Sequence, residues 1–122
     1  MITPLITANF ILDSEGNPKA IQSGEVKHYQ IQIQVENAPQ DTYAVTYELH
    51  PTYYEPVRES IQREENFAEK LTSYGDYLIR AKVRSKTGTQ TVVTPLSTAL
   101  TLGHPSAPSS PIGEALEHIR KR

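Results

Sequence analysis

The richest group of chemistry-bearing side chains lies in the loop expected after residue 49. It carries a histidine at His50, a hydroxyl at Thr52 and two adjacent tyrosines at Tyr53 and Tyr54. Loops held by a rigid scaffold are where binding residues concentrate, because they stay exposed while the scaffold fixes their ends. A ligand site and a purely structural loop are both compatible with this composition.

The sequence shows no recognisable catalytic machinery. A nucleophile needs an adjacent base and an orienting third group, and there is no serine or threonine elbow from which to build them. No glycine-rich phosphate loop occurs, and the chain has no cysteine. The four histidines do not follow a metal-ligand spacing; they are His28, His50, His104 and His118. We therefore expect no enzyme, no metal site and no cofactor.

Cations recur at every second position of one segment, at Arg80, Lys82, Arg84 and Lys86. In an extended strand they would form one basic stripe, which could hold phosphate or an acidic peptide. The favoured interpretation is protective: outward charges prevent an exposed strand from pairing edge to edge, and they could pair with Glu48 across the sheet. Too few aromatic residues accompany the stripe to indicate a nucleic-acid platform.

Three segments alternate apolar and polar residues with period two, which is the pattern of a half-buried strand. They cover residues 29–35, 43–49 and 77–83. The first two are joined by a short connector rich in turn formers, which suggests an antiparallel hairpin. Three tyrosines are expected on the inward faces of these strands, namely Tyr43, Tyr47 and Tyr77.

Further strands are expected around these three. Residues 7–12 could form an opening strand, and residues 91–94 and 97–102, separated by Pro95, are rich in β-branched residues and consistent with closing strands. The highly charged segment 55–70 is most simply a solvated loop. Short strands without a long helical crossover indicate a β-sandwich or a β-barrel.

The C-terminal segment has a different composition. Residues 104–110 form a Pro/Ser linker, and Ser110 followed by Pro111 is a suitable helix cap and first turn. A helix from there would place Ile112, Leu116 and Ile119 on one side. Because so short a helix is marginal in isolation, it would pack on the sandwich, meet a partner or fray.

Bulk composition narrows the class of protein. A chain of 122 residues fits one domain, and 12 basic against 14 acidic residues give a net charge of −2, too small to attract nucleic acid or anionic membrane over a long range. The absence of cysteine suits a reducing cytoplasm. We expect neither a signal peptide nor a membrane span.

Two short motifs resemble those of the YEATS family. Its first pattern is a strand ending in Leu-His, a variable residue, Ser or Thr, an aromatic, and then a proline shortly before a basic residue. Leu49-His50-Pro51-Thr52-Tyr53 and Pro56-Val57-Arg58 match it in order. The second pattern, Gly-aromatic-Gly/Ala-acidic-aromatic, is matched by Ser73-Tyr74-Gly75-Asp76-Tyr77 except at Ser73. The resemblance spans residues 26–102 and is greatest to the prokaryotic branch.

The resemblance implies an all-β fold, an immunoglobulin-like two-sheet β-sandwich, and the C-terminal segment adds a short helix. We expect a YEATS-like sandwich over residues 1–103, the linker over 104–110 and an amphipathic helix or tail over 111–122. Eukaryotic members of the family read acylated lysine in a channel between two loops. By position, Tyr53 and Tyr74 would be the aromatic walls, Thr52 the hydroxyl that contacts the amide, His50 the residue that steadies the loop, and Gly75 the point of close backbone approach.

The leading hypothesis is therefore a recognition module for a modified protein or peptide, with acylated lysine as the candidate ligand. The alternative is an interaction or assembly adaptor that uses a sheet edge or the C-terminal helix to bind a partner protein or effector domain, without a small-ligand pocket. We expect no membrane or nucleic-acid partner and a cytoplasmic location.

Overall fold

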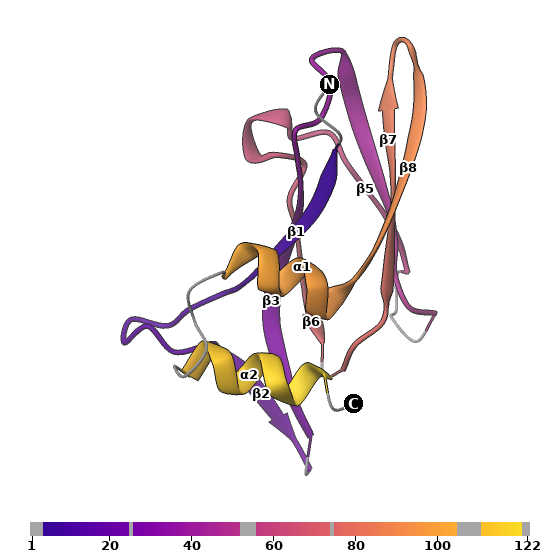
Figure 1. Cartoon of the computed structure of the whole chain (residues 1–122). Coiled ribbons are helices and arrows are strands. Elements are labelled where there is room, and N and C mark those ends of the chain that lie inside the picture. The colour runs from indigo at the N-terminus through magenta and orange to yellow at the C-terminus, as the bar shows by residue number, and fades with distance from the viewer. Residues whose placement is uncertain (1–3, 25, 52–55, 74, 105–110, 121–122) are drawn as a thin grey trace.

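The computed structural model describes residues 4–24, 26–51, 56–73, 75–104 and 111–120. Within these ranges the chain forms two antiparallel sheets of four strands each, two short helices and a 3-10 turn, η1 (Arg63–Glu65) (Figure 1). None of the helices described is long and apolar enough to cross a membrane. The predicted all-β, two-sheet architecture with a short C-terminal helix is confirmed.

The first sheet is built around β3 (Val26–Glu36), the longest alternating segment of the sequence. Along one side of β3 lie β1 (Leu5–Phe10) and β2 (Ala20–Ser23), which pair with its C-terminal and N-terminal halves respectively. On the other side lies β6 (Glu69–Ser73). The alternation of β3 buries its apolar side chains in the core and turns its glutamines outward; the buried residues are Tyr29, Ile31, Ile33 and Val35.

The second sheet has the strand order β5-β4-β7-β8, with β5 (Val57–Ser60) and β8 (Gly88–Pro95) at its edges. Its inner strands are β4 (Thr42–Glu48) and β7 (Leu78–Ser85). Ile79, Ala81 and Val83 of β7 are fully or almost fully buried, so the intervening cations of this strand point outward. Because β7 is an interior strand, the prediction that its cations protect an exposed edge is wrong.

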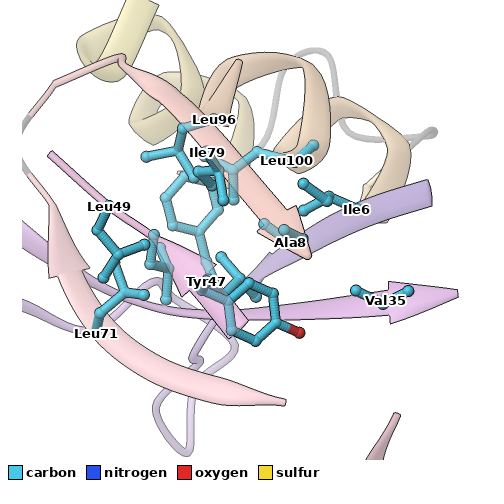
Figure 2. Close-up of a cluster of buried hydrophobic side chains, with 14 of the residues drawn as sticks. Ile6, Ala8, Val35, Tyr47, Leu49, Leu71, Ile79, Leu96 and Leu100 are labelled. Atoms are coloured by element: carbon cyan, nitrogen blue, oxygen red, sulfur yellow. The ribbon is translucent and has the colours of Figure 1, made fainter. Parts of the chain in front are cut away.

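The two sheets meet over a continuous apolar core, part of which Figure 2 shows. Tyr47 is its largest fully buried side chain, and its hydroxyl donates a hydrogen bond of 2.6 Å to the backbone oxygen of Phe67. Burial raises the pKa of the Tyr47 phenol, and the charge of Glu69 raises it further. The phenol therefore stays neutral and serves as a donor inside the core.

Helix α1 (Leu96–Gly103) covers the free side of β1 (Figure 1). Leu96, Ala99 and Leu100 are fully buried, at the i, i+3, i+4 spacing of a helix face. At its end, a Cβ on Gly103 would lie 1.9 Å from the backbone oxygen of Ala8. Glycine thus permits the close approach of this helix to the strand.

Helix α2 (Pro111–Arg120) packs against the same side of the sandwich. Ala115 and Ile119 belong to the buried core, with Ile112 and Leu116 partly buried beside it. The side chain of His118 lies 2.6 Å from the Tyr29 hydroxyl, measured at Nδ1. The predicted helix and its apolar side are confirmed. Of the three alternatives, packing on the sandwich, meeting a partner or fraying, the structure shows the first.

Residues 97–102, expected as a closing strand, form part of α1 instead. Pro95 ends the ladder of β8, and the following Leu96, Ala99 and Leu100 bury a helical face that the β-branched composition concealed. The charged segment 55–70, expected as a loop, contains β5, η1 and the first residues of β6. These short strands gain their hydrogen bonds from β4 and β3, which local sequence does not reveal.

The expected hairpin between residues 29–35 and 43–49 is also wrong, because β3 and β4 belong to different sheets. Asn37 adopts a left-handed conformation, with a φ of 60°, in the connector that carries the chain across. The apolar faces of the two strands consequently meet through the core rather than through a backbone ladder. Tyr43, expected inward, is 56% exposed, and it lies where the register of β4 against β7 shifts between Thr42 and Ala44.

Candidate functional site

The two segments that carry the sequence motifs lie at the same end of the second sheet. β4 runs antiparallel to β7, and the last residue of β4, Glu48, pairs with Arg80 close to the beginning of β7. The loop that leaves β4 therefore emerges beside the loop that enters β7. The side chains agree with this register, because the rings of His50 and Tyr77 meet edge to face with their centroids 6.0 Å apart.

The first loop connects β4 to β5, and its base is closed by a hydrogen bond of 2.7 Å from the Leu49 N–H to the Pro56 oxygen. Leu49 is buried, whereas His50 is exposed at the start of the loop. The His50 ring thus lies at the base of the first loop, against Tyr77 of the second loop. Thr52 and Tyr53 fall outside the described residues.

The second loop connects β6 to β7 and is organised by Ser73, the position at which the sequence departs from the family motif. The buried Ser73 hydroxyl donates to the Gly75 oxygen at 2.8 Å and accepts from the Gly75 N–H at 3.4 Å. This side chain thus folds the loop back on itself, as serine hydroxyls commonly do in turns. Tyr74 lies outside the described residues.

Asp76 fixes the other half of the second loop to helix α1. Its carboxylate accepts hydrogen bonds from the Ser97 N–H at 2.9 Å and from the Ser97 hydroxyl at 2.7 Å. The residue that precedes α1, Pro95, offers no side-chain cap, so Asp76 satisfies an otherwise free N–H of the first turn from a distant part of the chain. The Leu96 N–H also donates to the Tyr77 oxygen at 2.8 Å.

Tyr29 connects the same end of the molecule to helix α2. It pairs with Ser73 across the first sheet, and its hydroxyl contacts His118. Burial raises the pKa of the Tyr29 phenol, with a further contribution from the nearby Glu114. The neutral Tyr29 phenol can donate a hydrogen bond to Nδ1 of His118. Both helices therefore brace the strand ends from which the second loop emerges.

The sequence proposes His50 and Gly75 as site residues, whereas Ser73 and Asp76, whose side chains organise the second loop, are not among the residues it proposes. Asp76 is the acidic member of the motif, but its partner Ser97 lies in a segment whose composition predicts a strand, so the sequence does not indicate the helix cap. Within the ranges described, no cluster of three or more histidine or acidic side chains could hold a metal ion. The described residues thus build the bases of two loops, which are held by aromatic, hydroxyl, carboxylate and backbone groups.

Comparison with known sequences identifies the family. A family model for the prokaryotic YEATS domain matches residues 28–94, more than half of the chain and including both loops. The chain belongs to the prokaryotic YEATS family. No curated protein matches this YEATS domain significantly.

Solved structures agree with this assignment at the level of the fold. The YEATS domain is similar to the yeast AF-9 homolog Yaf9, with a TM-score of 0.52 and 22% identity over 76% of this chain and 69% of Yaf9. A second structure, described as the Yaf9 YEATS domain recognizing the H3K122suc peptide, has a TM-score of 0.54 and 24% identity over 85% of this chain and 75% of that one. The immunoglobulin-like sandwich predicted for the chain is confirmed.

Proposed function

We propose that this YEATS domain is a recognition module that binds an acylated lysine, or a similarly flat and uncharged acyl group, between its two motif loops. Tyr53 and Tyr74 would form the aromatic walls and Thr52 would bind the amide through its hydroxyl. His50 would steady the first loop and Gly75 would allow close backbone approach. The module has no catalytic role in this proposal.

The observation that carries the proposal is the meeting of the two loops at one end of the sandwich. The pairing of Glu48 with Arg80 and the contact between His50 and Tyr77 bring the loop bases together, and Asp76 anchors the second loop to a helix. Binding sites built on braced loops lose less conformational entropy when a ligand orders them. Acylation removes the lysine charge, so aromatic faces can stack on the planar amide.

Family membership supports the same chemistry. The Yaf9 YEATS domain is described as recognizing an H3K122suc peptide. For the present domain the carrier of the acyl group stays open, and a protein or peptide with a modified lysine is the partner we propose. Helix α2 packs on the sandwich through Ala115 and Ile119, which favours the loops over this helix as the recognition surface.

The test is a titration of the domain with a panel of acyl-lysine peptides that differ in chain length and terminal charge, alongside the unmodified peptide. We expect saturable binding of at least one acyl peptide, and a loss of about tenfold or more in Tyr74→Ala, because a stacking wall is removed. Tyr43→Ala is the matched control, since Tyr43 is an exposed tyrosine at the opposite end of β4.

Far-UV circular dichroism and the melting temperature of both variants establish that each is folded. If no acyl peptide binds the wild-type domain, or if Tyr74→Ala and Tyr43→Ala bind equally well, the proposal is wrong. Binding of the unmodified peptide with the same affinity would also contradict it, because the acyl group would then contribute nothing.

A further inference from the structure

The outer face of the second sheet carries a basic stripe that the acyl-binding proposal does not use. Arg80, Lys82 and Arg84 occupy successive outward positions of β7, because Ile79, Ala81 and Val83 fill the inward ones. Side chains on one face of a strand repeat every ~6.6 Å, so the three cations form a regular row. Since β7 is an interior strand, this row lies on the middle of a sheet face rather than along its edge.

The carboxylates of the same face neutralise this row only in part. Glu48 lies 3.9 Å from Arg80 Nε and 3.9 Å from Lys82 Nζ, beyond hydrogen-bonding distance in both cases. In the described part of the chain, Glu48 Oε2 has no hydrogen-bond partner, and Arg84 has no ion-pair partner. With Glu59 as the second outward carboxylate, three cations face two anions, and most cationic N–H donors stay free for a partner.

Exposed aliphatic side chains border the cations. The strand registers align Val57, Glu48, Arg80 and Val93 in one row across all four strands. Val57 is 60% exposed and Val93 47%, while Leu78, the next outward residue of β7, is 63% exposed. Scattered exposed aliphatic residues are common, but three of them around a row of cations form a mixed surface typical of protein contacts.

We propose that this face, defined by Arg80, Lys82 and Arg84 with Val57, Leu78 and Val93 around them, binds a protein partner through an acidic extended segment. Carboxylates at alternate positions of such a segment have the same repeat as the cations, and its aliphatic side chains would cover the valines and the leucine. The exposed aliphatic side chains among these six favour a polypeptide over single-stranded nucleic acid, which stacks its bases on aromatic rings. This proposal is independent of acyl-lysine binding.

The test is a titration of the ¹⁵N-labelled domain with a short synthetic peptide of alternating glutamate and valine. We expect saturable shifts of amide signals in β7, β8 and β5, and a loss of affinity of about tenfold in Arg80→Glu/Lys82→Glu/Arg84→Glu. Affinity should also fall as salt is raised, because exposed charges are screened within about 10 Å at 0.1 M ionic strength.

Two further variants keep the test decisive. Arg80→Gln/Lys82→Gln/Arg84→Gln removes the charges without introducing repulsion with Glu48, so it serves if the reversal variant fails to fold. Lys19→Glu/Lys27→Glu/Lys70→Glu is the matched control, because it makes the same change of charge at three exposed lysines outside β7. It should bind the peptide as the wild type does, because charges more than about 10 Å from the stripe are largely screened.

Equal binding of a glutamine-valine peptide, an equal loss in both reversal variants, or no saturable shift would overturn the proposal. Tighter binding of an oligothymidine to the same amides would also overturn it, in favour of a phosphate ligand. An acyl-lysine titration of Lys82→Glu/Arg84→Glu, which leaves the pairing of Arg80 with Glu48 intact, separates the two proposed surfaces, because we expect acyl-lysine binding to be unchanged in this variant.

Discussion

The region matched by the YEATS family model and the segments that flank it contribute differently to this domain. Residues 28–94 contain both motif loops and all of the second sheet except its last residue, Pro95. The flanking residues supply β1 and both helices. Yet the contacts that hold the second loop cross this boundary, since Asp76 binds Ser97 and Tyr29 binds His118. The second motif loop is thus held in part by residues that lie outside the region matched by the family model.

This difference shows that the residues of a motif loop and the residues that support it need not lie in the same stretch of sequence. If the flanking segments are integral to the domain, substitutions in them should cost as much stability as substitutions in the matched core. Substitutions in the flanking segments should also weaken the contacts that hold the second loop.

The largest effect is expected from Leu100→Ala in α1. Leu100 is fully buried, so its truncation removes apolar contacts and leaves a cavity, which typically costs about 2–5 kcal/mol of unfolding free energy. Chemical denaturation monitored by circular dichroism measures this change. Leu102→Ala is the matched control, because Leu102 belongs to the same helix but is 50% exposed. Equal costs in the two variants would show that α1 is not integral to the core.

A smaller effect is expected from Asp76→Ala. The substitution leaves the Ser97 N–H and hydroxyl without their acceptor, and loss of a helix cap typically costs about 0.5–2 kcal/mol. Acyl-peptide binding should weaken together with stability, because the second loop loses its anchor. Asp76→Asn retains an acceptor oxygen and should recover most of both properties. A folded Asp76→Ala domain with wild-type stability would contradict the capping role.

The smallest effect on stability is expected from acidification, which would disrupt the contact between His104 and β1. His104 Nε2 accepts a hydrogen bond of 3.0 Å from the Phe10 N–H, which requires an unprotonated nitrogen, and burial lowers the pKa of His104 below 6.5. The folded state therefore binds fewer protons, and the stabilisation from this group is complete above about pH 6.5 and is lost as the pH falls below it. Melting temperatures at neutral and acidic pH measure the loss.

His104→Gln is the variant for this test, because a glutamine oxygen can accept the same hydrogen bond without titrating near neutral pH. It should melt close to the wild type at neutral pH and lose less stability on acidification. If the acid dependence of the two proteins is the same, His104 does not contribute to it.

The sequence predicts the parts of this fold that depend on local periodicity. The alternation in residues 29–35, 43–49 and 77–83 identifies three central strands, and the Pro111 start identifies α2. The sequence does not predict the elements whose structure depends on contacts with distant parts of the chain. β5 and β6 are short, charged and stable only beside β4 and β3, and residues 97–102 become helical because the core and Asp76 favour a helix there.

The candidate site also has features that the sequence predicts and features that it does not. The motifs place both loops correctly relative to the strand ends, because strand order and direction follow from the sandwich. The supports of the second loop could not be predicted, since Ser73 departs from the motif and Ser97 lies 21 residues from Asp76. The binding roles of all five site residues remain predictions for binding experiments to test; they are His50, Thr52, Tyr53, Tyr74 and Gly75.

The bond between Asp76 and Ser97 also makes helix α1 a reporter of the second loop. The Ser97 amide can exchange its hydrogen with solvent only when this bond opens. A ligand that holds the loop in place would make such openings rarer, and exchange at Ser97 would slow although the ligand touches no residue of the helix. Occupancy of the loops could thus be read from one backbone amide outside the region that defines the family.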